Sequence, residues 1–282
     1  MFNILNKIKS ILYNILMLNL AKHFLRNFFF YIKLDISKKT DEKKIEDFFK
    51  MLRPYDLGYD LIRIGSNNDG GYLVPNILDK INTCISPGVG DTNLFEKDLE
   101  SRGIKSFMLD HTVDENSKLV KNFDFTKKKL NIYDDNSNVT LESFCSSKLK
   151  ENDNSILQMD IEGDEYLNIL STNNETLNRF KIIIIEFHYL ERVANKSLFN
   201  LYNETINKLL KYFDICHIHA NNWGRNFSVT SKLKIPQVLE VTFLNKKLSK
   251  YKKPITILPH KLDAKCDENK PEIVLDNFFL SY

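Results

Sequence analysis

The sequence predicts an α/β protein built on a doubly wound, mostly parallel β-sheet. From residue 81 onward, short apolar runs alternate with segments of helical character, and several of these runs end in an acidic residue or a histidine. The chain has 282 residues, of which 43% are hydrophobic, so a large core can form and a disordered chain is excluded. A net charge of +3 is too small to indicate nucleic-acid binding.

Residues 1–50 differ from the rest and predict a basic, amphipathic helical extension followed by a linker. Residues 1–33 contain basic side chains and no acidic ones. Apolar residues recur there at helical spacing, which indicates one apolar face. The stripe consists of Ile4, Ile8, Ile11, Ile15 and Leu18. Its uncharged part is too short to span a bilayer. The helix therefore packs on its own domain or on a second subunit, the more common arrangement, or it lies in an anionic membrane interface.

The elements of the expected domain, residues 51–282, follow in order. Two apolar runs flank residues 67–71, an Asn-Asn-Asp-Gly-Gly turn, and predict a hairpin within residues 51–80. Residues 81–245 form the predicted core, and residues 246–282 form a tail. Strands are expected at residues 83–86, 106–109, 129–133, 156–159, 182–185, 214–219 and 238–244, and helices at 93–101, 140–150 and 197–211.

Glycines and acidic residues follow the first two core strands. In open α/β sheets, ligands bind beyond the carboxyl ends of the strands. Gly88 and Gly90 come after the first strand and let a ligand approach the backbone closely. Asp110 ends the second strand, where an acid can hydrogen-bond ribose hydroxyls. Asn93 replaces the third glycine of a dinucleotide motif, so this pocket suits a nucleoside better than a pyrophosphate.

These motifs resemble the FkbM-type S-adenosylmethionine-dependent methyltransferases. Residues 160–165 read DIEGDE and match the D-[IV]-E-G-x-E pattern of that family. Ser-Pro-Gly-Val-Gly at 86–90 and Ile-Glu-Phe-His at 185–188 support the match, which covers about residues 53–245. The resemblance implies the class I methyltransferase (Rossmann-like) fold, a seven-stranded sheet with the last strand antiparallel. It also implies the cofactor S-adenosyl-L-methionine, bound by Gly88, Gly90, Asp91, Glu96, Asp110 and Asp160. Asp134 or Asp135 is a looser candidate for the adenine edge, and an exposed turn acid is an equal alternative there.

The catalytic candidates are His188, Asp160 and Glu186. A methyl group on a sulfonium is already activated, so the protein mainly has to align the attack and exclude water. A sugar hydroxyl is a poor nucleophile and gains from a general base. His188 is the first candidate for that base because a histidine ordinarily titrates near neutral pH. Asp160 is the second, or holds the ammonium end of the cofactor, and Glu186 orients either the histidine or the substrate. A structural His188 bonded to a backbone carbonyl is the alternative.

The segment around residues 216–223 is the predicted substrate-binding part. Trp223, Asn221 and Asn222 combine an aromatic face with paired amides, which suits a sugar ring, although a polar turn would look the same. His217 and His219 alternate on a strand and share one face. With the neighbouring Cys216 they suggest zinc, but a third ligand would have to come from elsewhere, so a site without metal is favoured.

The sequence thus predicts an O-methyltransferase that acts on a sugar hydroxyl in surface glycan or nucleotide-sugar biosynthesis. Its acceptor would be a small molecule or a glycan. Four scattered cysteines without CxxC spacing fit a reducing compartment, so we expect a cytoplasmic protein, with contact at the inner membrane face as the alternative. Two other functions stay open: a non-catalytic cofactor-binding scaffold of a glycan-assembly complex, and a nicotinamide oxidoreductase, which the missing third glycine disfavours.

Overall fold

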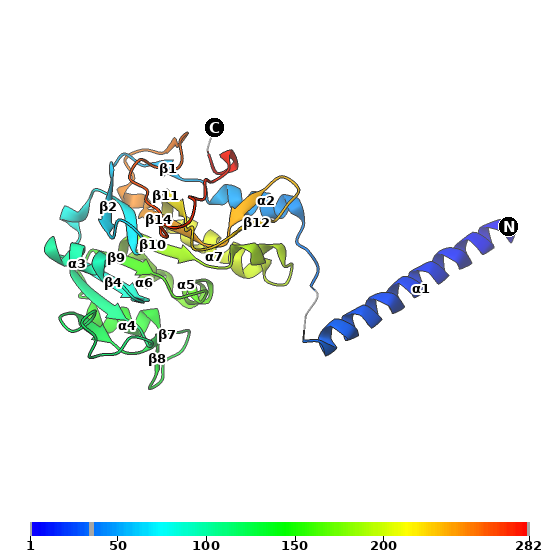
Figure 1. The fold of residues 1–282 in the computed structure, drawn as a ribbon, viewed down its shortest axis with the longest axis horizontal. Helices are drawn as coiled ribbons and strands as arrows, with labels where there is room; N and C mark the ends of the chain where they lie inside the picture. Colours follow the sequence, from blue (N-terminus) through cyan, green and yellow to red (C-terminus); the bar gives the residue numbers. More distant parts are fainter. Residues whose placement is uncertain (1, 34–36, 281–282) are drawn as a thin grey trace.

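The structure, a computed structural model, describes residues 2–33 and 37–280 (Figure 1). Its helices are α1 (Phe2–Tyr31), α2 (Glu42–Met51), α3 (Leu94–Ser101), α4 (Leu141–Lys148), α5 (Glu165–Ser171), α6 (Asn174–Asn178) and α7 (Phe199–Tyr212). Short 3-10 helices span Leu78–Lys80, Leu190–Ala194, Lys246–Leu248 and Asn277–Phe279. The strands are β1 (Tyr55–Asp56), β2 (Leu61–Gly65), β3 (Gly71–Pro75), β4 (Thr83–Pro87), β5 (Lys105–Leu109), β6 (Asp124–Thr126), β7 (Lys129–Leu130), β8 (Asn138–Val139), β9 (Ser155–Met159), β10 (Phe180–Phe187), β11 (Phe213–Ala220), β12 (Asn226–Ser228), β13 (Lys234–Pro236), β14 (Leu239–Asn245) and β15 (Lys253–Pro254).

The central sheet has seven strands in the order β11-β14-β10-β9-β4-β5-β6. Neighbouring strands from β10 to β6 are parallel, whereas β14 runs antiparallel to both β10 and β11. β14 is the last of the seven along the chain, so the predicted mostly parallel sheet with an antiparallel last strand is present. The carboxyl ends of β4, β5, β9 and β10 consequently meet at one edge, where a ligand site is expected.

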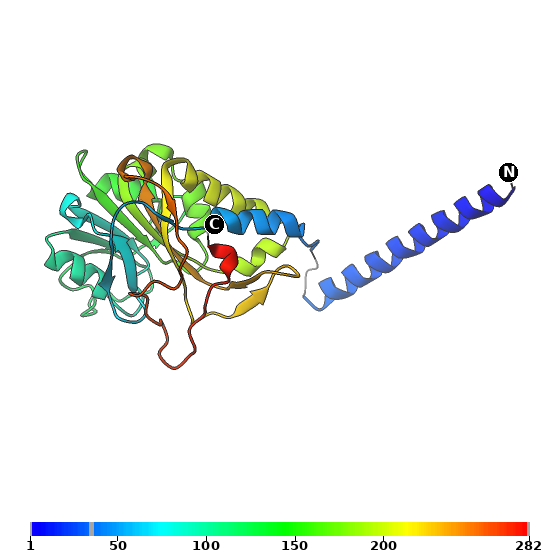
Figure 2. The same ribbon diagram turned by 90° about the horizontal axis from the view of Figure 1, so that it is seen from above.

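Strand β10 shows why this sequence forms a sheet that is covered on both faces. Its consecutive isoleucines alternate between two hydrophobic clusters. Ile183 and Ile185 pack with residues of α5 and α7, whereas Ile182 and Ile184 pack with residues of α3 and of the β2–β3 hairpin. The ribbon in Figure 2 shows helix α7, in yellow-green, and the hairpin, in cyan, on different sides of the central strands. The hairpin itself was predicted from its Asn-Asp-Gly-Gly turn, and β2 and β3 pair antiparallel as expected.

The third parallel strand differs from its prediction. The sequence placed it at residues 129–133, but the strand next to β5 is β6, and β7 pairs with β8 in a separate two-stranded sheet. β6 lies at the edge of the sheet and its three residues are only partly buried. An edge strand needs fewer apolar residues than a central one, so its hydrophobic pattern is weak.

Helix α2 belongs to the α/β domain, although the sequence placed the domain boundary after residue 50. Ile45, Phe48 and Phe49 on this helix are fully buried in the main hydrophobic cluster. The tail after residue 245 is also part of the domain, because β15 pairs antiparallel with β1. Both ends of the domain therefore pack on one core.

Helix α1 is not amphipathic, which corrects the prediction. Apolar residues follow one another directly, as in Leu16, Met17 and Leu18. Successive side chains on a helix are rotated by about 100° around its axis, so these residues surround the helix and do not form one face. These side chains are about half exposed, and the helix extends away from the α/β domain (Figure 1). The side chains of Ile4 and Ile8 lie outside the described residues. None of the described helices is long and apolar enough to cross a membrane.

We expect α1 to bind anionic membranes, because its exposed apolar side chains are stabilised by leaving water and its basic residues are attracted to anionic lipids. Deleting residues 1–33 should abolish sedimentation with vesicles that contain an anionic lipid. Vesicles of zwitterionic lipid alone serve as the control. Equal sedimentation of the full chain and the deletion variant would contradict this expectation. Loss of dimerisation without any vesicle binding would assign the helix to a second subunit.

Gly88 fixes how closely β4 and β9 approach at the ligand edge. Its φ is 87°, and a Cβ atom built there would lie 1.6 Å from the carbonyl oxygen of Asp160. Gly103 has a similar φ of 81°, yet a Cβ atom there would meet nothing within 4 Å. The two glycines therefore share the backbone strain that a side chain would suffer, and differ only in the steric clash.

We predict that Gly88→Ala destabilises the protein far more than Gly103→Ala. The control variant should lose about 1–3 kcal/mol from its unfavourable backbone conformation. Gly88→Ala must in addition push β4 away from the backbone at Asp160. Urea unfolding monitored by circular dichroism measures both free energies. Equal losses for the two variants would show that the strands are not held this closely.

Candidate active site

The acidic residue that ends β5 lies against the glycine turn that follows β4. The Asp110 Oδ2 atom accepts hydrogen bonds from the N–H groups of Val89 at 2.9 Å and Gly90 at 3.2 Å. Its Oδ1 atom accepts from the N–H and the hydroxyl of Thr112, both at 2.7 Å. Burial alone would raise the pKa of Asp110, but these hydrogen bonds outweigh it and lower the pKa. The carboxylate is therefore ionised at neutral pH and holds the turn in place.

A cavity of about 210 Å³ opens beside this carboxylate. Leu109, Leu130 and Ile161 give it apolar walls, and Asp110 supplies an ionised acceptor. The lining also includes Asp160, Glu162, His111, Lys128 and Lys129. A slot with these apolar walls and an ionised acid at Asp110 has the chemistry to hold a nucleoside, with the base between the walls and the ribose on the acid. Asp134 and Asp135 do not line this cavity; they bond the turn and the N-terminus of α4.

A second cavity of about 200 Å³ adjoins the first and shares Gly88, Gly90, Asp160 and Glu162 with it. Its lining is acidic and, in the described part of the chain, includes no Lys or Arg. The full lining is Asp69, Gly70, Tyr72, Gly88, Val89, Gly90, Asp91, Thr92, Phe95, Glu96, Gln158, Asp160 and Glu162. A site of this charge attracts a cation or an uncharged polar group and repels anions.

Two predicted cofactor ligands, Asp91 and Glu96, lie in this second cavity. Asp91 is exposed at its rim. Glu96, on α3, is almost fully buried and accepts a hydrogen bond from the Ser86 hydroxyl. Burial raises the pKa of Glu96 even though that hydrogen bond opposes the shift. The structure thus brings all the predicted cofactor residues around two connected cavities.

His188 is surrounded by carboxylates. Its Nδ1 atom lies 3.0 Å from Oε1 of Glu165 and 3.1 Å from the backbone oxygen of Glu186. Its Nε2 atom lies 3.5 Å from Glu162, 3.7 Å from Asp160 and 3.9 Å from the Glu186 carboxylate. Burial alone would lower the pKa of His188, but these acidic neighbours raise it to about 9. The expected titration near neutral pH is therefore wrong, because His188 is protonated there.

Asp160, and not His188, has a pKa near neutral pH. Burial raises the pKa of Asp160 to about 7, while the positive charge of His188 opposes the shift. Its Oδ1 atom is buried and makes no hydrogen bond within the described part of the chain. This carboxylate faces both cavities and changes its charge near neutral pH.

Glu186 lies behind the cavities in a buried hydrogen-bond network. Asn221 donates to its Oε1 atom at 2.6 Å, and the hydroxyl of Tyr72 donates to its Oε2 atom at 3.4 Å. Burial, then repulsion by Asp160 and Glu240, raises the pKa of Glu186 well above its ordinary value. Glu186 thus connects β10 with the β2–β3 hairpin and with the end of β11.

Three of the five predicted substrate residues are covered by the C-terminal tail, and none of the five lines either of the two cavities. His217 lies 2.9 Å from Asp263, and His219 lies 2.9 Å from Glu272. Asn222 exchanges two hydrogen bonds with the backbone of residue 267. Asn221 faces Glu186 instead, and Trp223 is 56% exposed with the Lys270 ammonium 4.3 Å from its ring centre.

Several site residues were missed by the sequence reasoning. Glu165, the first residue of α5, is fully buried and accepts N–H groups of Ile161 and Gly163 as well as contacting His188. The DIEGDE motif includes Glu165, but an acidic residue in the first turn of a helix is also favoured by the helix dipole alone, so the motif does not single it out. Asp69 lies in the hairpin turn, and the sequence had predicted only a turn from its neighbouring glycines.

A larger cavity, of about 920 Å³, lies at the opposite end of the hairpin and includes Tyr55 and Tyr251.

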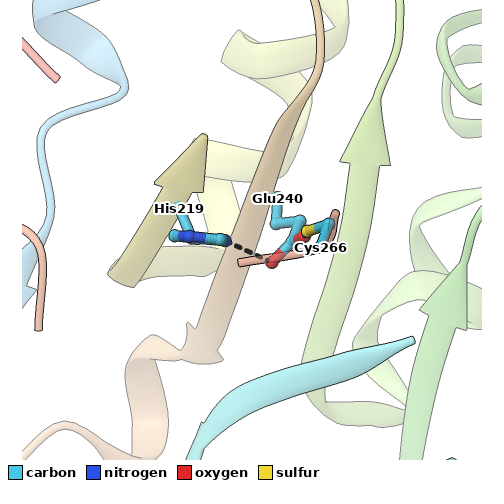
Figure 3. Close-up of side chains that lie close together, drawn as sticks. All are labelled: His219, Glu240 and Cys266. Atoms are coloured by element: carbon cyan, nitrogen blue, oxygen red, sulfur yellow. Dashed lines mark hydrogen bonds and ion pairs between the residues drawn. The ribbon is translucent and has the colours of Figure 1, made fainter. Parts of the chain in front are cut away.

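Two groups of side chains in the described residues have ligand atoms close enough together to hold a metal ion. One is Asp160, Glu165 and His188 in the active site. The other is His219, Glu240 and Cys266, under the C-terminal tail (Figure 3). The sequence favoured a site without metal, and the zinc ligands it considered were His217, His219 and Cys216. Only His219 belongs to the second group, whose other members, Glu240 and Cys266, had not been considered.

Comparison with known proteins identifies the family. No curated protein matches the chain. A crystal structure of a protein from Thermoplasma acidophilum covers 58% of this chain and 79% of its own, at 9% identity and a TM-score of 0.28, a similarity too low to support any inference. The family model described as the methyltransferase FkbM domain matches residues 56–216, which include the glycine turn, both cavities' acidic residues and His188. The chain therefore belongs to the FkbM methyltransferase family.

Proposed function

We propose that the protein is an S-adenosylmethionine-dependent O-methyltransferase that methylates a sugar hydroxyl, in keeping with the expected role in surface glycan or nucleotide-sugar biosynthesis. The pair of adjoining cavities carries this proposal, because it combines an apolar slot that ends in a ribose-binding acid with an acidic chamber. S-adenosylmethionine has an adenosine that matches the slot, and a sulfonium centre and an α-ammonium group that match the acidic chamber. Its carboxylate would have to point away from the acidic side chains.

The residues present fit this cofactor. Asp110 is ionised and would bind the ribose hydroxyls, while Leu109 and Leu130 would flank the adenine. Gly88 and Gly90 leave room for the part of the cofactor that passes between the two cavities. The acidic side chains of the second cavity would stabilise the positive charge next to the transferable methyl group. When bound, the cofactor supplies an activated methyl group, and the protein supplies alignment and a base.

Asp160 is the base that the geometry favours. A pKa of about 7 leaves a large fraction of this carboxylate ionised at neutral pH, so it can accept the proton of an acceptor hydroxyl. Protonated His188 cannot accept that proton. Its role would be to hold the charge of Asp160 and Glu162 and to orient the acceptor. The Glu186 carboxylate lies 3.9 Å from Nε2 of His188, and would help to orient His188 and Asp160.

The charge of the second cavity narrows the choice of acceptor. Phosphate groups would be repelled by Asp69, Asp160 and Glu162. The sugar that enters is therefore uncharged or carries an amine, which favours a glycan over a nucleotide-sugar. A nucleotide-sugar would have to keep its pyrophosphate outside this chamber.

Calorimetric titration with S-adenosylmethionine tests the cofactor assignment. The wild-type protein should bind, and Gly90→Arg and Asp110→Ala should abolish binding, because the first fills the cavity and the second removes the ribose acceptor. Asp135→Ala, which removes an exposed turn acid that lines neither cavity, is the matched control and should bind normally. Absence of binding to the folded wild-type protein would end the proposal.

Asp160→Asn should lower methyl transfer at saturating cofactor by about 10²-fold or more, as expected for loss of a general base, and should also weaken cofactor binding, because Asp160 lines both cavities. Transfer of a labelled methyl group to a panel of sugars measures this. Wild-type turnover should rise with pH through about 7, as Asp160 loses its proton. In His188→Gln the rise should move to higher pH, because the positive charge that lowers the pKa of Asp160 is gone. Full turnover in Asp160→Asn would remove Asp160 from this role.

A further inference from the structure

Three side chains from distant parts of the chain converge beneath the C-terminal tail. His219 comes from β11, Glu240 from β14 and Cys266 from the tail (Figure 3). The Nδ1 atom of His219 lies 3.1 Å from Oε2 of Glu240, and Sγ of Cys266 lies 3.1 Å from Oε1 of the same carboxylate. All three residues are between 4% and 6% exposed. This site is separate from the cavities assigned to the cofactor and the acceptor.

The contact between Nε2 of His219 and Glu272 leaves the Nδ1 atom of the ring able to bind a metal. Its Nε2 atom lies 2.9 Å from Oε1 of Glu272, so the Nε2–H group donates to that carboxylate. A neutral imidazole with this tautomer has a lone pair on Nδ1, which is the atom that faces Glu240. Histidines that bind metals usually have a carboxylate or carbonyl partner on the other ring nitrogen, because it fixes the ring and makes it a better ligand.

Two buried carboxylates lie side by side at this site. Glu240 lies directly opposite Glu186 in the register of β10 and β14, and both are nearly fully buried. A divalent ion bound to Glu240 would offset this negative charge, and would also allow the Cys266 thiol to ionise.

We propose that His219, Glu240 and Cys266 bind a zinc ion that fastens the C-terminal tail to the central sheet. One imidazole, one thiolate and one carboxylate form a borderline-soft ligand set that suits zinc, whereas magnesium and calcium prefer oxygen ligands alone. Ligand atoms about 2.1 Å from a tetrahedral ion lie about 3.4 Å apart. The two contacts of Glu240, both 3.1 Å, are close to this spacing, and the ligand atoms of all three residues lie within 4.8 Å of one another. Three protein ligands leave a fourth position for water.

The zinc ion would make the attachment of the tail depend on metal. The same tail segment also contributes Asp263 to His217 and Glu272 to His219, so it covers the end of β11 through several polar contacts. Cys266 is the one member of the proposed ligand set that the tail supplies. Loss of the metal should therefore loosen residues 263–272 before it affects the sheet.

Cobalt titration of the full chain, freed of any affinity tag and of bound metal, tests the proposal. One Co²⁺ per chain should bind and produce a thiolate-to-cobalt absorption band, and one equivalent of Zn²⁺ should abolish it. Cys266→Ser should remove the band. Cys216→Ser is the matched control. Cys216 is also buried, but it lies on β11 and its Sγ contacts the backbone oxygen of Thr242, not Glu240. Glu272→Gln should keep the band but weaken metal affinity by about 10- to 100-fold.

The absence of a thiolate band in the folded wild-type protein would overturn the proposal, and so would a band that survives in Cys266→Ser. Metal binding without the band would assign the ion to Asp160, Glu165 and His188, which include no thiol. If Cys266→Ser does not fold, hydrogen exchange of the wild type decides the matter. Zinc should slow amide exchange in residues 263–272, and unchanged exchange would contradict the site.

Discussion

The hydrogen bonds that the Asp110 carboxylate accepts from Val89 and Gly90 hold together the loops that follow two neighbouring strands. These bonds keep the glycine turn open, and the cavity beside it has its size and charge because of them. The close approach of Gly88 to the carbonyl of Asp160 joins the third strand end to the same edge. The proposed cofactor pocket depends on these contacts, because without them its apolar walls and its acids would not face one another.

The order of elements could be predicted because it depends on local patterns. The Asn-Asp-Gly-Gly turn specified the hairpin, and the run of isoleucines in β10 specified a strand covered on both faces. The edge strand β6 could not be found in this way, since an edge contributes little apolar surface. The helical stripe of α1 was misleading, because a regular apolar spacing does not exclude apolar residues between its members.

The site residues that follow predictable strands could also be predicted, whereas those that depend on long-range contacts could not. Gly88, Asp110 and Asp160 were predicted because each directly follows a strand whose position the sequence shows. The covering of His217 and His219 by the tail was not predictable, because it joins residues far apart in the chain that have no motif in common. The protonation of His188 likewise depends on carboxylates from different elements, which only the folded arrangement brings within a few ångströms of the ring.

Glu186 lies between the two proposed sites, with the cavities on one side and Glu240 with its proposed metal on the other. The proposed function depends on a cofactor that occupies the two adjoining cavities. A crystal structure of the complex with S-adenosylhomocysteine would test this. We expect ribose hydroxyls within hydrogen-bond distance of Asp110 and the sulfur atom facing Asp160. A ligand bound in the larger cavity beside Tyr55 and Tyr251, or one that leaves Asp110 without a ribose contact, would contradict it.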